Sequence, residues 1–201
     1  MLDTRADLER IGVRLAWPLL RRLPKGDGRP VVILPGFTND DGQGDFLVRL
    51  LGELDYDVHG WGLGRNEGPS PELDEALLAI PDRFDEPVSL IGISLGGVYA
   101  RGIARERPDR VRRVITLGSP HQSPRRFRPT RVLPPVADRD LGPVPVPSTA
   151  IVARFDQIVR AEHAVLDTDP HAETITITGG HCGMARNPLM MRAIVLRLSG
   201  D

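Results

Sequence analysis

The sequence has a single cysteine, almost no net charge and no long apolar run. Cys182 is the only cysteine among 201 residues, which excludes an intramolecular disulfide framework and favours a reducing compartment. The formal net charge of −1 gives no overall field that would favour nucleic acid or an anionic membrane as a partner. No stretch approaches the roughly 20 apolar residues that span a bilayer, so stable membrane insertion is not expected.

The N-terminus also lacks the pattern of a secretory signal. Charged residues stand at positions 3, 5, 7, 9 and 10, where a signal peptide has a basic start followed by an uninterrupted apolar stretch. The expected location is therefore the cytoplasm, with removal of a signal peptide as the alternative. The length suits one domain over residues 1–201, and the sequence leaves the oligomeric state open.

From residue 30 onward, short apolar runs alternate with helical patterns. The runs are rich in Val, Ile and Leu, which is typical of strands buried on both faces of a sheet. Strands are expected at Val31–Leu34, Tyr56–Gly60, Val88–Gly92, Val111–Leu117, Thr149–Ala153 and Thr174–Thr178. Helices are expected at Gly44–Leu54, Pro71–Phe84, Leu95–Arg107 and Pro188–Leu198. This alternation predicts an α/β fold with a doubly wound, mainly parallel six-stranded sheet.

An amphipathic helix is expected over residues 4–23. Leu8, Ile11, Leu15 and Leu19 recur there at steps of three and four residues, the spacing of one helix face. The helix either packs against the body of the domain or seeks a lipid surface.

Residues 121–147 break the rhythm and are interpreted as a short cap or lid insertion. The stretch 120–147 contains eight prolines, and Arg125, Arg126, Arg128 and Arg131 form a basic cluster within it. Long proline-rich excursions in compact α/β domains are usually functional insertions. The cluster is either solvated surface or a contact for an anionic substrate or lipid head group.

The strongest local signal is the motif Gly92-Ile93-Ser94-Leu95-Gly96-Gly97, which lies between an expected strand and an expected helix. Small residues two positions on either side allow a sharp turn at Ser94. The serine hydroxyl is then held at a helix N-terminus, where the helix dipole and free N–H groups favour developing negative charge. Ser94 is therefore predicted to be a nucleophile.

Two further side chains complete the predicted site. Chain order in such sites is serine, acid, histidine. His181 directly follows the last expected strand, whereas His59, His121, His163 and His171 are less well placed. Asp156 follows the fifth strand and could orient His181, with Asp167 and Asp169 as rivals and Asp138 and Asp140 inside the insertion. The backbone N–H groups of Leu95 and Phe37 are the expected oxyanion donors, since Gly36 permits close approach.

The chain resembles the α/β-hydrolase family, specifically its small bacterial lipase and esterase branch. The resemblance is carried by Leu34-Pro35-Gly36-Phe37, the segments 59–66, 92–97 and 155–159, Gly118-Ser119-Pro120-His121, and His181-Cys182-Gly183-Met184. It implies hydrolysis of a small-molecule or lipid ester through an acyl-enzyme, with no cofactor. Pro35 stands where relatives often have histidine, the first two strands of the fold have no counterpart, and the lid region is short.

Several residues have two interpretations. Trp61, Arg65 and Asn66 either line the substrate pocket or pack their loop. Asn39, Asp40 and Asp41 lack the alternating spacing of a calcium loop, so a turn is expected and no metal site. Cys182 is expected to be a small packed thiol. The whole site could instead serve an acyltransferase, or the chain could be a non-catalytic binding protein on the same fold.

Overall fold

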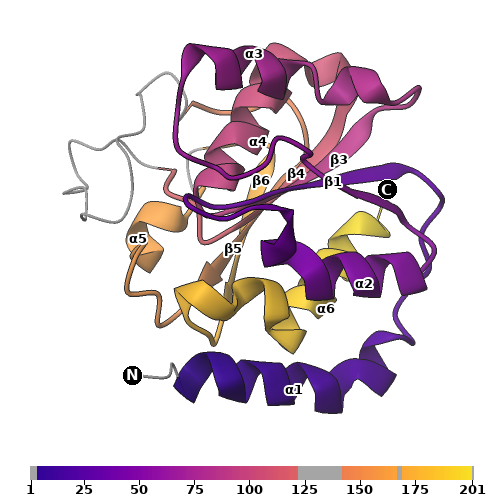
Figure 1. The fold of residues 1–201 in the computed structure, drawn as a ribbon, viewed down its shortest axis with the longest axis vertical. Helices are drawn as coiled ribbons and strands as arrows, with labels where there is room; N and C mark the ends of the chain where they lie inside the picture. Colours follow the sequence, from indigo (N-terminus) through magenta and orange to yellow (C-terminus); the bar gives the residue numbers. More distant parts are fainter. Residues whose placement is uncertain (1–3, 122–141, 167–168, 201) are drawn as a thin grey trace.

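The computed structural model describes residues 4–121, 142–166 and 169–200, and their side chains from residue 11 onward (Figure 1). Its centre is a sheet of six parallel strands in the order β2-β1-β3-β4-β5-β6. The strands are β1 (Pro30–Leu34), β2 (Asp57–Gly60), β3 (Val88–Ile93), β4 (Val111–Leu117), β5 (Ser148–Ala153) and β6 (Ala172–Ile177). All six predicted strands are present, with bounds that differ by two residues at most, and the predicted fold class is confirmed.

Helices connect and cover these strands. They are α1 (Thr4–Leu20), α2 (Asp45–Glu53), α3 (Pro71–Leu78), α4 (Leu95–Glu106), α5 (Ala161–Ala164) and α6 (Pro188–Leu198). Short 3-10 turns are η1 (Asp41–Gly44), η2 (Pro81–Arg83), η3 (Pro108–Arg110) and η5 (His181–Arg186). Two of the helices begin with a polar cap followed by proline: Ser70 caps α3 and Asn187 caps α6, which satisfies backbone N–H groups in the first turn.

Two expected helix ends are corrected by the structure, and two short elements were not expected. The first helix ends at Leu20 instead of residue 23, and Arg21, Arg22 and Leu23 follow it in hydrogen-bonded turns. The helix expected over Pro71–Phe84 ends at Leu78, and η2 follows at Pro81. The turns α5 and η5 were not expected, because four to six residues are too short to show a helical period.

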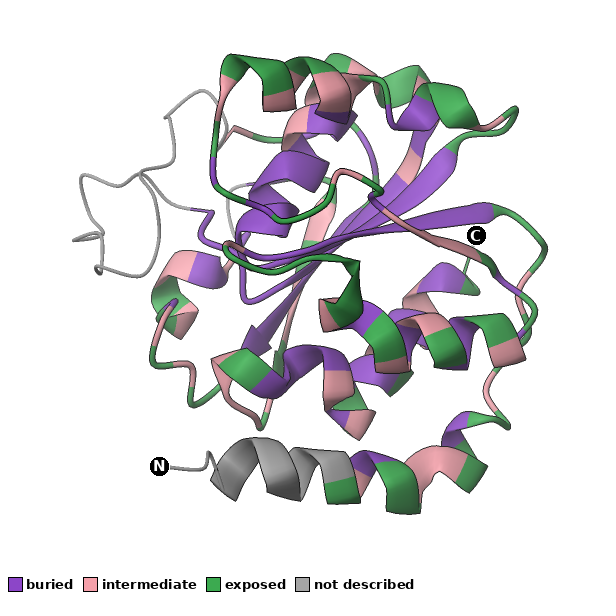
Figure 2. Ribbon diagram, viewed as in Figure 1, coloured by how far each residue is buried: buried purple, intermediate pink, exposed green. Residues whose placement is uncertain are grey.

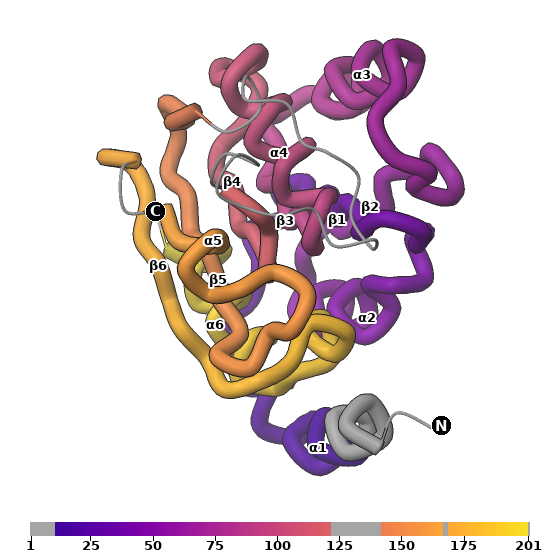
Figure 3. Tube along the Cα trace, turned by 90° about the vertical axis from the view of Figure 1, so that its left-hand side faces the viewer, coloured from indigo at the N-terminus to yellow at the C-terminus, as the bar shows by residue number. Residues whose placement is uncertain are grey.

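Helices cover both faces of the sheet. Figures 1 and 3 show α2 and α6 on one face, with α1 outside them, and α3 and α4 on the other. Alternate residues of β1 enter separate buried clusters, with Val31 and Ile33 toward α2 and Val32 and Leu34 toward α4. This strict alternation explains why a strand buried on both faces reads as a continuous apolar run.

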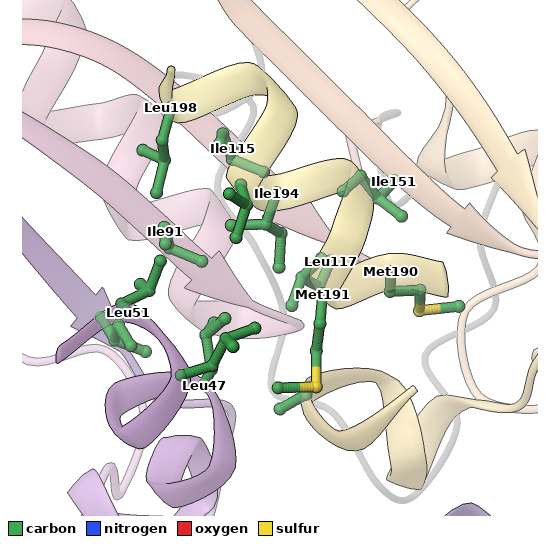
Figure 4. Packing of buried hydrophobic residues seen from close by; sticks show 14 of the residues in the cluster. Leu47, Leu51, Ile91, Ile115, Leu117, Ile151, Met190, Met191, Ile194 and Leu198 are labelled. Carbon is green, nitrogen blue, oxygen red and sulfur yellow. The ribbon is translucent and has the colours of Figure 1, made fainter. Parts of the chain in front are cut away.

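The core beneath α2 and α6 holds the sheet and these helices together. Figure 4 shows Leu47 and Leu51 of α2, Met191 and Ile194 of α6 and Ile91 of β3 within one buried cluster. All five side chains are 0% exposed, and burial of each such side chain contributes about 1.5–3 kcal/mol. Figure 2 shows the central strands β1, β3, β4 and β5 as largely buried, whereas the edge strands β2 and β6 are intermediate or exposed.

The start of α4 lies unusually close to the sheet, and its glycines permit this approach. A Cβ atom on Gly92 would lie 2.2 Å from the Cα of Gly97, and one on Gly97 would lie 2.0 Å from Ser119 Oγ. A Cβ on Gly96 would lie 2.3 Å from the carbonyl oxygen of Leu34. No side chain fits at these positions without moving the helix away from the strands.

Replacing two glycines of α4 by alanine should therefore have opposite effects on stability. Gly97→Ala should lower the free energy of unfolding by about 1–3 kcal/mol, because the added methyl overlaps Ser119. Gly102→Ala is the matched control: among the described residues no atom lies within 4 Å of a Cβ there, so helix propensity should raise stability by up to about 1 kcal/mol. Urea unfolding measures both, and equal effects at the two positions would contradict the packing argument.

Candidate active site

Ser94 is the single residue that joins β3 to α4. Its backbone has φ 52° and ψ −119°, a left-handed conformation that residues with a side chain rarely adopt. The turn is held by a hydrogen bond of 2.8 Å from the N–H of Ser94 to the carbonyl oxygen of Leu117. Strain of this kind costs about 1–3 kcal/mol and persists only where the surroundings impose it. The sharp turn expected at the serine is present.

His181 and Asp156 meet Ser94 at the carboxyl edge of the sheet. His181 Nε2 lies 3.0 Å from Ser94 Oγ, and His181 Nδ1 lies 2.7 Å from Asp156 Oδ2. Asp156 is almost fully buried, with its side chain 1% exposed, and that of His181 is 12% exposed. The three side chains predicted from the sequence are thus joined by two hydrogen bonds.

Backbone groups fix the carboxylate of Asp156. Its Oδ1 atom accepts hydrogen bonds of 2.8 Å from the N–H groups of Ile158 and Val159, which leaves Oδ2 directed at His181. With Asp156 accepting the Nδ1 proton, Nε2 is the nitrogen that can accept the Ser94 proton. His181 was expected on a loop but is the first residue of η5, so its backbone is held by a turn.

The loop after β1 passes directly beside the serine. A Cβ on Gly36 would lie 3.2 Å from that of Ser94, so any other residue here would require the loop or the serine to shift by a few tenths of an ångström. The N–H of Gly36 donates to Gln43 Oε1 at 2.7 Å, whereas the N–H groups of Phe37 and Leu95 make no hydrogen bond to another described residue. The two backbone donors expected from the sequence therefore have no competing partner among the described residues, and their role as an oxyanion hole stays a prediction.

Asn66 holds this loop from the opposite side. Its Nδ2 donates to the carbonyl oxygen of Pro35 at 2.9 Å. Its backbone accepts from Thr38 N at 2.7 Å and donates to Asn39 O at 2.8 Å. Thr38 has a positive φ of 64°, so the backbone just beyond Phe37 is strained and is held by Asn66.

The two neighbours predicted with Asn66 lie elsewhere. Trp61 is 0% exposed, and its indole N–H donates to the carbonyl oxygen of Gly64. Arg65 is exposed. For Trp61 and Asn66 the contacts fit loop packing, the second interpretation given above, and a pocket role for Arg65 stays a prediction.

Comparisons with solved structures agree with this architecture. N-formylmaleamic acid deformylase from Pseudomonas putida has a TM-score of 0.64 and 17% identity, covering 86% of this chain and 93% of its own. A monoacylglycerol lipase from Paleococcus ferrophilus has a TM-score of 0.64 and 15% identity, covering 88% and 96%. A thermophilic esterase from Thermogutta terrifontis has a TM-score of 0.62 and 19% identity, covering 86% and 90%. This chain has the α/β-hydrolase fold.

Comparison by sequence finds no relative, in contrast to comparison by structure. No family model matches the chain, and no curated protein matches its sequence. The likeness to these α/β hydrolases is therefore one of fold, at identities where the sequence no longer shows it. The expectation from the short motifs, that the chain resembles this family, is confirmed at the level of the fold.

Within the α/β-hydrolase fold, one rival for the acid has a different role. Asp169 Oδ2 lies 2.8 Å from Arg101 Nη2, with the two side chains only 2% and 1% exposed. Burial alone would raise the pKa of Asp169, but the bond to Arg101 and the N–H groups of His171 and Val144 hold it below its ordinary value. Arg101 Nη2 also donates to the carbonyl oxygen of Gly142 at 2.9 Å. This ion pair, which the sequence analysis missed, joins α4 to the segments 142–144 and 169–171.

Other sequence candidates fall outside the site or outside the described residues. Asp40 Oδ1 accepts from the N–H of Gly42 at the start of η1, which agrees with the expected turn, and Asp41 accepts hydrogen bonds from Trp61 N and Gly62 N across the fold. Within the described ranges no cluster of three or more potential metal ligands occurs. Cys182 is exposed, so the expected packed position is wrong. Asp138, Asp140, Asp167, the arginines at 125–131 and most of the 121–147 insertion lie outside the described residues.

His121 is buried behind the site and stays neutral. Its Nε2 lies 2.9 Å from Thr116 Oγ1, and its backbone N–H donates to the carbonyl oxygen of His163 at 2.7 Å. Burial, aided by the positive charge of Arg101, lowers the pKa of His121 from 6.5 to about 3. The unfolded chain therefore binds a proton at this position at a higher pH than the folded chain does.

His121 should make the fold sensitive to acid. The pKa of His121 is lower in the folded chain than in the unfolded chain. Its contribution to the free energy of unfolding is therefore constant above pH 6.5, and that free energy falls as the pH drops from 6.5 toward 3. At pH 5 the loss is about 2 kcal/mol relative to pH 7.5. Urea unfolding of His121→Gln at the two pH values should lack this difference, whereas the exposed His59→Gln should retain it. An unchanged difference in His121→Gln would show that other groups carry the acid sensitivity.

Proposed function

We propose that this chain is a carboxylic ester hydrolase that works through an acyl-enzyme, with Ser94 as nucleophile, His181 as general base and Asp156 as the residue that orients it. The observation that supports this most is the unbroken hydrogen-bond path from Ser94 Oγ to His181 to Asp156. Among structures with the same fold, one is named a monoacylglycerol lipase and another an esterase, which favours small-molecule or lipid esters as substrates.

The first half of the reaction forms the acyl-enzyme. Ser94 Oγ attacks the acyl carbonyl carbon while its proton moves to His181 Nε2. The carbonyl oxygen becomes an oxyanion and accepts hydrogen bonds from the N–H groups of Phe37 and Leu95. The buried carboxylate of Asp156 stabilises the imidazolium that forms. When the tetrahedral intermediate collapses, the bond to the alcohol breaks and the alcohol takes the proton from His181.

The second half releases the acid and restores the serine. Water attacks the acyl carbon as His181 Nε2 takes its proton, and a second oxyanion forms in the same place. Collapse of this intermediate breaks the bond to Ser94 Oγ, which recovers its proton from His181. The products are a carboxylic acid and an alcohol, and the site returns to its starting state.

The triad assignment predicts two losses of activity. Ser94→Ala should lower kcat for p-nitrophenyl butyrate by roughly 10⁴-fold or more and should abolish labelling by a fluorophosphonate probe. Asp156→Asn should preserve folding and lower kcat by up to about 10⁴-fold, because His181 loses its orienting acceptor. A wild-type chain that neither labels nor hydrolyses any ester in a panel would instead be a binding protein. Preferential transfer of the acyl group to added alcohols would indicate an acyltransferase.

Asn66 is assigned as a positioning residue for the oxyanion loop. Asn66→Ala removes the bond to Pro35 that holds the backbone at Phe37, and a small displacement of one oxyanion donor costs about 10²-fold in rate. We expect kcat to fall by that order with KM nearly unchanged, when rates are normalised to sites titrated with the probe. Asn66→Asp keeps the side-chain acceptor but loses the donor to Pro35, so it should resemble Asn66→Ala. A purely structural role would lower the melting temperature and leave kcat per titrated site intact.

A further inference from the structure

The outer side of α1 carries a row of exposed apolar side chains. Ile11, Leu15 and Leu19 are 56%, 78% and 67% exposed, and their spacing of four residues places them on one side of the helix. Only two other large apolar residues among the described side chains are as exposed, Phe155 and Leu189. This concentration on one helix is unusual for a surface exposed only to water. We call Ile11, Leu15 and Leu19 the outer row.

The outer row is not needed to hold α1 in place. The opposite side of the helix buries Val13 and Leu20 against the core beneath α2 and α6. Trp17 donates its indole N–H to Glu53 Oε2 at 3.1 Å. Figures 1 and 3 show α1 as the outermost layer on this face, beyond α2 and α6. The helix is therefore apolar on two sides, and only the inner side has a partner within the described residues.

The charge of this segment differs from that of the rest of the chain. Residues 1–25 contain six basic and three acidic residues, a net charge of +3, whereas the whole chain carries −1. The remaining residues therefore carry −4. Arg14 on α1 and Arg22 just beyond it are both exposed beside the outer row. An apolar row with basic neighbours is complementary to a surface that has negative charges on the outside and an apolar layer beneath them.

We propose that α1 docks this protein, peripherally and reversibly, on an anionic lipid surface. The outer row enters the boundary between head groups and acyl chains, and Arg14 and Arg22 contact the head groups, whereas Arg21 and Lys25 are paired with Glu53 and Asp55. No helix of the described residues is long and apolar enough to cross a bilayer, so docking takes place at one face of the membrane.

A second copy of the chain is a poorer occupant. In a two-fold dimer the same patch meets itself, so Arg14 and Arg22, both exposed beside the row, would be brought close to the same positive charges of the other copy. Three side chains also form a smaller surface than stable interfaces require, which is about 800 Å² on each partner. The charge that disfavours a dimer is the charge that favours an anionic membrane.

Vesicle flotation tests the docking directly. Wild-type protein should bind vesicles of mixed phosphatidylcholine and phosphatidylglycerol, should bind pure phosphatidylcholine vesicles less, and should be released by high salt. The triple variant Ile11→Ser, Leu15→Ser, Leu19→Ser should lose at least about tenfold in affinity. Arg14→Gln removes one positive charge and should lose about fivefold in affinity, whereas Arg160→Gln, at a side chain 76% exposed and outside α1, makes the same charge change and should have little effect.

Two further measurements keep the result interpretable. Hydrolysis of p-nitrophenyl butyrate by each variant reports folding, since the outer row lies outside the proposed site. If neither the wild-type protein nor any variant hydrolyses this ester, the proposed function is wrong. The flotation assay still tests membrane docking in that case. Absence of wild-type binding at low salt, or equal binding by the triple variant, overturns the proposal. Sedimentation that reveals a dimer abolished in the triple variant would assign the outer row to a second copy.

Discussion

The architecture of the site depends on one constraint: the chain must turn from β3 into α4 across a single residue without moving α4 away from the sheet. Three glycines make this possible, since a Cβ on Gly92, Gly96 or Gly97 would overlap backbone or Ser119 atoms. The remaining residue of the turn, Ser94, then adopts a positive φ. Packing on both sides of the sheet sustains this backbone strain. The turn leaves the Ser94 hydroxyl and the N–H of Leu95 next to each other at the start of α4.

The partners of Ser94 come from separate parts of the chain, and each is fixed by contacts of its own segment. Asp156 is held by two N–H groups in the turn after β5, His181 begins η5, and Phe37 lies on a loop that Asn66 clamps. None of these supports relies on another of the functional side chains. A site built in this way is ordered before any substrate enters, which is what electrostatic stabilisation of a developing charge requires.

Sequence patterns predicted the strands and the Ser94 motif because both follow local rules. Continuous apolar runs report burial on two faces, and a serine among glycines between strand and helix reports a sharp turn. The roles of Asn66 and Arg101 could not be read in this way. Each acts through partners more than 25 residues away, and a buried arginine gives no periodic signal. Exposure of Cys182 was missed because burial of a lone cysteine is only a tendency.

The overall net charge was the least informative property of the sequence, because it averages two opposite regions. A basic first segment and an acidic remainder nearly cancel in the total charge. A nearby surface nevertheless responds mainly to the charges within a Debye length of about 8 Å, because more distant charges are screened by salt. α1 contacts η5, the turn that begins at His181. The helix proposed to meet lipid is therefore packed against the element that carries the proposed base, so docking through α1 would hold the catalytic edge close to the membrane in one fixed orientation.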